Sequence, residues 1–227
     1  LCGGLFVSLA TFFRIPVSTS QSVVGSVAGV GVAGDLTVKW AKLIRIGQCW
    51  VFCPILTMVL TNVIYRALRR GLRNVESSRT VEQVLTITVV VTAGYAAYSL
   101  GANNLGNAIG PIMALEQEVM DPRILTVAGA LSIAMGALLF GRGVAETVGR
   151  DIIPLDMRSA TAVQISSAFG LHLFSMMGIP VSTSQSIIGA LLGIGMVHGI
   201  KTVSMRKIVE VMVGWVAVPS LSGVVSY

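Results

Sequence analysis

The sequence predicts an all-α, polytopic membrane protein. Of its 227 residues only 11% are charged, 54% are hydrophobic, and the mean hydropathy is +0.82. A soluble domain has about 25% charged residues, and a chain with so few charges could not cover a water-exposed surface. Disordered chains are poor in apolar residues, so disorder is excluded too. The net charge of +6 is modest, and membrane proteins gather Lys and Arg in cytoplasmic loops. We therefore expect membrane lipid, not nucleic acid, as the surrounding partner.

Four apolar segments are candidates to cross a bilayer, which takes about 20 apolar residues. They are residues 46–65, 81–100, 124–140 and 208–227. Two further apolar stretches, 1–33 and 160–197, are each interrupted near the middle by a polar patch around a proline. We expect another interruption at 101–107, directly after the second span. The pattern predicts a multi-pass protein of the cell membrane.

The loop between the first two spans indicates the orientation of the chain. It contains five arginines and one glutamate, namely Arg66, Arg69, Arg70, Arg73, Arg79 and Glu76. Cytoplasmic loops carry an excess of Lys and Arg, so we expect this loop to be cytoplasmic. Counting spans and hairpins from it places residues 35–45 outside and residues 201–207 inside.

An internal repeat fixes the expected architecture. Residues 15–22, Ile-Pro-Val-Ser-Thr-Ser-Gln-Ser, recur unchanged at 179–186, and the match continues through three glycines, Gly25, Gly29 and Gly31, with Gly189, Gly193 and Gly195. With one added residue, Trp50 and Pro54 correspond to Trp215 and Pro219. A long repeat made of membrane spans is typical of transporters built from two halves.

The predicted sidedness places the two copies on opposite sides of the membrane, which makes the repeat inverted. In such folds the substrate lies near the midplane, where interrupted helices of both halves meet. We divide the chain into three parts. Residues 1–65 are the end of the first repeat and comprise a hairpin and the span that follows it. Residues 66–80 are a cytoplasmic linker, and residues 81–227 are the second repeat.

The repeated polar motif has the chemistry of an anion site. Proline disfavours helix in the residue before it, and Ser or Thr then caps the next helix. A helix N-terminus carries partial positive charge and free N–H groups that bind anions. Ser and Thr also join membrane helices by packing, but two symmetric copies favour a site. The candidate binding residues are Ser18, Thr19, Ser20, Gln21, Ser182, Thr183, Ser184 and Gln185.

A second polar cluster lies in Gly-Ala-Asn-Asn-Leu-Gly-Asn at 101–107. If a helix begins near Asn103, then Asn103 and Asn107 share a face. Each asparagine offers a carbonyl oxygen for a cation and N–H donors for an anion. We add Asn103, Asn104 and Asn107 to the substrate site and consider the same three as ligands of a sodium ion.

We expect no enzymatic activity and no resident cofactor. Cys49 and Cys53 lie four apart in an apolar span and are interpreted as core residues. His172 lies in an apolar stretch and His198 in a loop, and we interpret a lone histidine as structural. A serine nucleophile needs a base in fixed geometry, and the duplicated serines argue against one special nucleophile.

These motifs together resemble the PiT family of inorganic phosphate transporters, also called the Pho4 or solute carrier 20 superfamily. The carrying residues are GANNLGNAIGP at 101–111 and PVSTSQS at 16–22 and 180–186, and the likeness covers essentially the whole chain. It implies an inverted-repeat fold, re-entrant helical hairpins with the Ser/Thr motifs at their tips, and an oxyanion site built from both halves. Members use sodium or protons to drive phosphate uptake, and some move sulfate.

The chain departs from the family pattern at two positions. The family motif usually reads Gly-Ala-Asn-Asp, where this chain has Asn104, and some members carry a Glu where it has Ile133. The family motif occurs once per half, and at the spacing seen in the second half the first copy would fall before residue 1. We therefore expect the chain to lack an N-terminal part of 60-odd residues. We predict a secondary phosphate transporter coupled to Na⁺ or H⁺. A sulfate permease of the same fold is one alternative, and a channel-like pore or a non-transporting sensor is another. For the oligomeric state, a homodimer is an alternative to a monomer.

Overall fold

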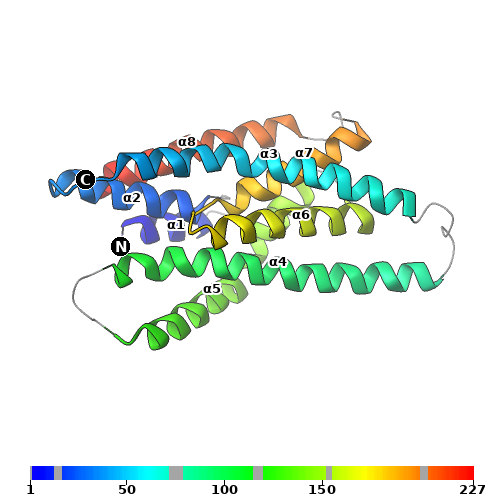
Figure 1. Ribbon diagram of the computed structural model, residues 1–227, viewed down its shortest axis with the longest axis horizontal. Helices are drawn as coiled ribbons and strands as arrows, with labels where there is room; N and C mark the ends of the chain where they lie inside the picture. Colours follow the sequence, from blue (N-terminus) through cyan, green and yellow to red (C-terminus); the bar gives the residue numbers. More distant parts are fainter. Residues whose placement is uncertain (1, 13–16, 72–78, 115–119, 152–154, 200–203) are drawn as a thin grey trace.

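The computed structural model describes residues 2–12, 17–71, 79–114, 120–151, 155–199 and 204–227, and within these the chain is helical without strands. The helices are α1 (Cys2–Phe12), α2 (Thr19–Ala33), α3 (Trp40–Gly71), α4 (Arg79–Met113), α5 (Pro122–Asp151), α6 (Met157–Met176), α7 (Thr183–His198) and α8 (Met205–Ser226). Figure 1 shows them in an elongated bundle, with α3 and α4 running along its length. The predicted fold class is confirmed.

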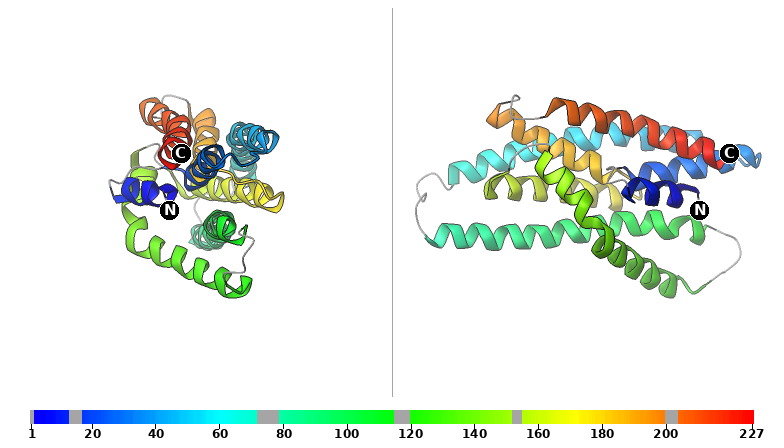
Figure 2. Two further views of the ribbon diagram at one scale, coloured as in Figure 1. Left: turned by 90° about the vertical axis from the view of Figure 1, so that its left-hand side faces the viewer. Right: turned by 180° about the vertical axis from the view of Figure 1, so that it is seen from behind.

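The four predicted spans lie in the long helices. Within the described residues, α3, α4, α5 and α8 are long and apolar enough to cross a membrane. Large apolar side chains on them point outward, such as Phe52 at 63% exposure and Leu138 at 84%. In a membrane protein such residues face lipid, where exposure of apolar surface carries no penalty. Figure 2 shows α5 inclined to the other helices and standing at the edge of the bundle.

The two interrupted stretches form helical hairpins, α1–α2 and α6–α7. In Figure 1, α1 and α2 lie toward one end of the molecule while α6 and α7 reach its middle from the other end. The helices α2 and α7 have 15 and 16 residues, or about 24 Å at most, too short to cross a hydrocarbon core of about 30 Å. They are re-entrant arms, and their opposite directions confirm the inverted repeat.

The helix starts at both tips follow the predicted capping. Ser18 and Ser182 are the N-caps of α2 and α7, and their hydroxyls accept hydrogen bonds from the main-chain N–H groups of Gln21 and Gln185. Residues 13–16, which hold Pro16 of the first motif, lie outside the described part of the chain.

Each hairpin packs on a span at the glycines of the repeat. A Cβ on Gly25 of α2 would collide with the carbonyl oxygen of Pro219 in α8, and a Cβ on Gly189 of α7 with that of Pro54 in α3. Small residues let membrane helices approach this closely. The first hairpin therefore packs on the last span and the second hairpin on α3, so the two repeats interleave. The division at 1–65, 66–80 and 81–227 stays a prediction.

The interruption predicted at 101–107 is wrong, because α4 continues without a break to Met113. Asparagine and glycine disfavour helix in isolation. Here the side-chain amide of Asn104 donates to the carbonyl oxygen of Leu100 one turn earlier, at 3.1 Å. Asn103 and Asn107 find partners on the hairpins. These contacts come from residues far away in the sequence and stabilise the helix through the polar segment.

Candidate functional site

The tips of the two hairpins are in direct contact at the centre of the molecule. The hydroxyl of Ser20, in the first turn of α2, donates to the main-chain carbonyl oxygen of Val181 at 2.7 Å. Both residues are buried, with exposures of 1% and 0%. The repeat therefore brings its two copies to one place, although they are 161 residues apart in the sequence.

The asparagine cluster of α4 lies against this junction. The amide of Asn103 donates to the Val181 carbonyl oxygen at 3.0 Å, and the amide of Asn107 donates to the hydroxyl of Ser20 at 2.8 Å. The predicted shared face of Asn103 and Asn107 is therefore confirmed. Asn103 also accepts a long hydrogen bond of 3.4 Å from the hydroxyl of Ser175 in α6.

Asn104 contacts the first tip from the same helix. Its side-chain oxygen accepts a hydrogen bond from the hydroxyl of Thr19 at 2.7 Å, while its amide donates to Leu100 within α4. The side-chain oxygen therefore holds the first hairpin to α4, and the amide is used within α4 itself. A carboxylate at this position would keep the first bond and lose the second, because a carboxylate has no donor.

The second tip has a different internal arrangement from the first. Ser184, the repeat equivalent of Ser20, shares a hydrogen bond of 2.9 Å with the N-cap Ser182 and does not cross to the other hairpin. The carbonyl oxygen of Pro180 accepts from the indole N–H of Trp50 at 3.0 Å. The second tip is thus held by α2, α3 and α4 through its main-chain carbonyls.

Several buried polar atoms at the tips have no partner among the described residues. They are both side-chain atoms of the Gln21 amide, the side-chain oxygen of Gln185 and the hydroxyl of Thr183. Gln21 and Gln185 occupy the N3 positions of their helices, where a glutamine can close a capping box by bonding back to the cap. The Gln21 amide does not do so. An unpaired buried polar group costs about 1–3 kcal/mol, so these atoms are suited to a ligand.

The site is rich in donors and has no acidic member among its described residues. The described acidic side chains, Asp35, Glu82, Asp121, Asp156 and Glu210, lie in loops or near helix ends. Two helix N-termini meet here, and each adds partial positive charge. No group of three His, Cys, Asp or Glu side chains in the described residues could hold a metal ion. Neutral hydroxyl and amide donors at two helix starts can bind an inorganic oxyanion.

The eleven predicted residues lie at the two tips and on the facing segment of α4, and the structure adds two residues, Ser175 and Trp50, that were not among the predicted site residues. Ser175 lies seven residues before the tip serine Ser182, on an apolar helix, and gave no signal. Trp50 did give one, because Trp50–Pro54 and Trp215–Pro219 are repeated. Its indole N–H donates to the tip at Pro180.

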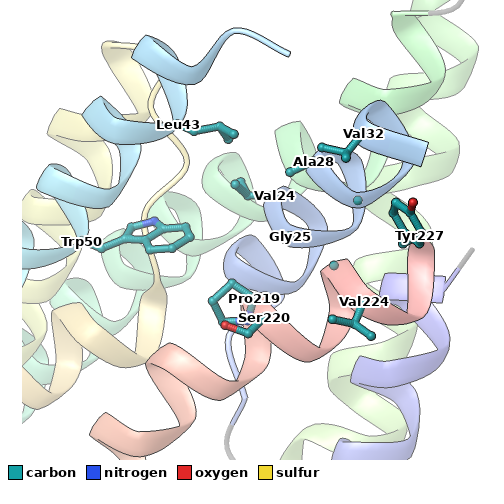
Figure 3. A pocket seen from close by; sticks show the side chains of 12 residues that line it. Val24, Gly25, Ala28, Val32, Leu43, Trp50, Pro219, Ser220, Val224 and Tyr227 are labelled. Atoms are coloured by element: carbon teal, nitrogen blue, oxygen red, sulfur yellow. The ribbon is translucent and has the colours of Figure 1, made fainter. Parts of the chain in front are cut away.

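An apolar hollow of about 610 Å³ lies outside this site, between α2, α3 and α8. Figure 3 shows the indole of Trp50 reaching into it from α3, toward Val24 of α2 and Pro219 of α8. Apart from Ser220 and Tyr227 its wall is made of apolar side chains and glycines, and of the polar tip residues none lines it. The Ser220 hydroxyl already donates to the carbonyl oxygen of Val216 in its own helix. The hollow therefore does not have the donors that an inorganic anion requires.

The known proteins that resemble this chain include permeases named for phosphate and for sulfate. The chain is 25% identical over 299 residues to "Putative phosphate permease PH0640" of Pyrococcus horikoshii, covering 98% of this chain and 74% of that protein. It is 33% identical over 219 residues to "Sulfate permease CysP" of Bacillus subtilis, covering 96% of this chain and 61% of that protein. A solved structure titled "The sodium-dependent phosphate transporter" superimposes with a TM-score of 0.82 at 20% identity, over 99% of this chain and 75% of its own, and shows the same fold.

The sequence model described as the phosphate transporter family, PHO4, matches residues 1–226. This match over nearly the whole chain establishes that the chain belongs to the phosphate transporter family.

Proposed function

We propose that this protein is a secondary active transporter that moves inorganic phosphate across the membrane. The anion binds between the two hairpin tips and the asparagine face of α4. The single observation that carries the proposal is the set of buried, unpaired polar atoms on Gln21, Thr183 and Gln185. They belong to both copies of the repeat and lie in the first turns of α2 and α7.

The chemistry of these atoms suits hydrogen phosphate in particular. Its unprotonated oxygens need donors, which the Gln21 amide, the Thr183 hydroxyl and the two helix starts supply. Its P–O–H group needs an acceptor, and the side-chain oxygens of Gln21 and Gln185 are acceptors without a partner among the described residues. In this proposal Ser18 and Ser182 hold the helix starts, and Ser20 and Asn103 hold the tips together.

Sulfate is the second candidate. Sulfate carries no proton at neutral pH and suits a site made of donors, and Asn104 stands where the family usually has an acid. The relative named a sulfate permease is 33% identical to this chain. Both observations favour sulfate without excluding phosphate, since the two anions share size, shape and charge.

A coupling gradient of sodium or protons drives uptake in this proposal. A sodium ion would need oxygen ligands, and the side-chain oxygens of Asn103 and Asn104 already accept hydrogen bonds from Ser175 and Thr19. These contacts make the three-asparagine set a weaker sodium site than a carboxylate would give. The site therefore supports proton coupling better than sodium coupling.

Uptake measurements test the proposal directly. The protein is produced in cells that lack their own phosphate and sulfate uptake systems, and labelled phosphate and labelled sulfate are supplied separately. Saturable phosphate uptake that collapses when ion gradients are dissipated is the expected result. Saturable sulfate uptake alone would select the second candidate, and uptake that is linear in concentration and independent of gradients would indicate a pore. No uptake of either anion would contradict transport.

A further inference from the structure

A histidine–tyrosine pair lies on the α4–α6 interface next to the anion site. The Nδ1 atom of His172 in α6 is 3.0 Å from the hydroxyl oxygen of Tyr95 in α4. The ring of Tyr98 meets the same imidazole edge-on, with ring centroids 5.6 Å apart. His172 is half-buried, and it lies one helical turn before Ser175, which donates to Asn103 of the anion site.

This pair is the middle of a series of polar contacts between two parallel helices. The hydroxyl of Thr92 donates to the side-chain oxygen of Gln164 at 2.6 Å, Tyr95 contacts His172, and Ser175 donates to Asn103. The series runs from the beginning of the hairpin arm α6 inward to the tips. An ionisable residue at membrane depth is costly, and such residues in transporters mark proton relays.

The helices packed on α6 offer few other groups that could titrate near His172. From α4 they are Tyr95 and Tyr98, and from α3 Cys49 and Cys53, which belong to the apolar cluster around Leu171. The only such group of α7 is His198 at its far end. Among the described side chains, Glu82 precedes Tyr95 by 13 residues and Asp156 precedes His172 by 16 residues, which is at least about 20 Å along a helix.

We propose that His172 is the proton-binding residue that couples anion transport to a proton gradient. The inference rests on the proposed transport function and selects the coupling ion within it. Imidazole is the side chain whose unperturbed titration lies between pH 5 and 8, at about 6.5. The anion site has no described carboxylate for this task, and His172 is the histidine that its helix connects to the site through Ser175 and Asn103.

The proton has a defined place on the ring in either tautomer. If Tyr95 donates to Nδ1, the added proton goes to Nδ1 and the Tyr95 hydroxyl turns from donor to acceptor. If Nδ1–H donates to Tyr95, the added proton goes to Nε2. In both cases one proton and one positive charge are gained, and no other bond is formed or broken.

Charge provides the coupling between the two sites. In this proposal an anion held at the tips favours the imidazolium form of His172, and the imidazolium favours the anion, because opposite charges stabilise each other. Such coupling is reciprocal and is typically about 5- to 150-fold in affinity. The protein would then bind proton and anion together and release them together.

The chain contains a matched control for this pair. His198 at the end of α7 bonds through Nε2 to the hydroxyl of Tyr65 in α3 at 2.7 Å, with the two rings edge-on at a centroid distance of 5.0 Å. This pair has the same chemistry as Tyr95–His172 but lies at the far end of α7 from its tip. If His172 acted only by packing, replacing it should change transport no differently from replacing His198.

The experiment compares His172→Gln with His198→Gln in proteoliposomes. Labelled sulfate is the first probe, because it does not titrate between pH 5 and 8. If the protein takes phosphate alone, the same variants are compared with phosphate, whose own titration is common to all of them. Two quantities are measured: accumulation driven by an imposed pH gradient without sodium, and anion counterflow without a gradient as a function of pH.

For His172→Gln we expect at least tenfold less accumulation from the pH gradient, and counterflow that is measurable but no longer depends on pH. His198→Gln should behave as the unmodified protein in both assays. Should His172→Gln fail to fold, Tyr95→Phe serves instead. It removes the hydroxyl group that contacts the imidazole and should shift the pH midpoint of counterflow.

Three outcomes would overturn the proposal: an unshifted midpoint in Tyr95→Phe, unchanged gradient-driven accumulation in His172→Gln, or accumulation that needs sodium. Absence of counterflow in the unmodified protein would instead refute the transport function itself.

Discussion

The hydroxyl of Ser20 donates a hydrogen bond of 2.7 Å to the carbonyl oxygen of Val181, so the first hairpin tip is tied directly to the main chain of the second. The same hydroxyl accepts from the amide of Asn107 at 2.8 Å. One serine therefore connects α2, α4 and the tip before α7. Any movement that opens the site between the tips must break or rearrange these bonds.

Replacing this serine tests the tip contact. Ser20→Ala removes these two bonds and a longer one of 3.4 Å that the hydroxyl accepts from the amide of Asn103. Among the described residues, the Val181 carbonyl oxygen then keeps only its bond from the Asn103 amide. Each lost bond costs about 0.5–1.5 kcal/mol, so we expect a lower melting temperature in detergent and reduced anion uptake. The matched variant is Ser184→Ala, at the equivalent position of the other tip, whose hydroxyl bonds only to Ser182. An equal fall in melting temperature in the two variants would contradict the conclusion that Ser20 ties the two tips together while Ser184 bonds only within its own tip.

Thr183→Val separates anion binding from folding. The Thr183 hydroxyl is buried and has no partner among the described residues, and valine has nearly the same shape. Removing an unpaired buried hydroxyl should leave the melting temperature the same or raise it. If the hydroxyl binds the anion, KM for uptake should rise about tenfold, the equivalent of one hydrogen bond to a charged group. Thr19→Val is the comparison, since it breaks the hydrogen bond from Thr19 to Asn104 and should therefore lower the melting temperature as well as raise KM. An unchanged KM in Thr183→Val would show that the Thr183 hydroxyl does not bind the anion.

Gly189→Ala tests the close packing of hairpin and span. The added methyl group would collide with the Pro54 carbonyl and the Thr57 side chain, and both belong to a transmembrane helix with little room to shift. Overpacking of this kind costs about 1–3 kcal/mol, so we expect a clearly lower melting temperature and poor yield of folded protein. Gly136→Ala in α5 is the control, because a Cβ there meets nothing within 4 Å. Equal stability of the two variants would disprove the close approach of α7 to α3.

The sidedness of the chain can be measured with single cysteines. After Cys2, Cys49 and Cys53 are replaced, one cysteine is placed at Ser77 in the arginine-rich linker and another at Leu36 between α2 and α3. Leu36 is 65% exposed. The positive-inside bias predicts that a membrane-impermeant thiol reagent applied to intact cells labels the Leu36→Cys protein and spares the Ser77→Cys protein. The reverse pattern would invert the orientation of every element.

The sequence predicted those features whose cause is local or repeated. A Ser or Thr cap after each proline was predicted from the local sequence, and Ser18 and Ser182 are those caps. The repeat, combined with the sidedness of the charged loops, predicted that α2 and α7 point in opposite directions. The continuity of α4 was not predictable, because the groups that satisfy Asn103 and Asn107 are Val181 and Ser20, distant in the sequence. The unequal bonding of Ser20 and Ser184 has the same origin. The two tips have identical local sequences but different neighbours, and these tertiary contacts determine which hydrogen bonds each serine makes.

Asn104 should help to determine which anion the protein prefers. Its side-chain oxygen accepts from Thr19 and its amide donates to Leu100, so the residue links the first tip to α4 without charge. Asn104→Asp keeps the bond from Thr19, which becomes about twice as strong with a charged acceptor. It loses the bond to Leu100 and adds a negative charge beside the tip. A carboxylate accepts the P–O–H proton of hydrogen phosphate but can only repel sulfate. We therefore expect the ratio of phosphate to sulfate uptake to rise about tenfold, with new sodium dependence if the charge lies beside a cation site.

Competition between labelled phosphate and unlabelled sulfate, with and without sodium, measures this ratio. The control is Asn62→Asp, the same chemical change on α3, where the side-chain oxygen accepts from Arg66 and the amide reaches Gly193 at 3.4 Å. That variant should leave the ratio unchanged, because its new charge is paired with arginine. A ratio that is also unchanged in Asn104→Asp, with no effect of sodium, would mean that Asn104 does not face the anion. The Thr19–Asn104 bond would then serve only to pack α2 against α4, and selectivity would have to come from Gln21 and Gln185, whose side-chain oxygens remain the unpaired acceptors at the tips.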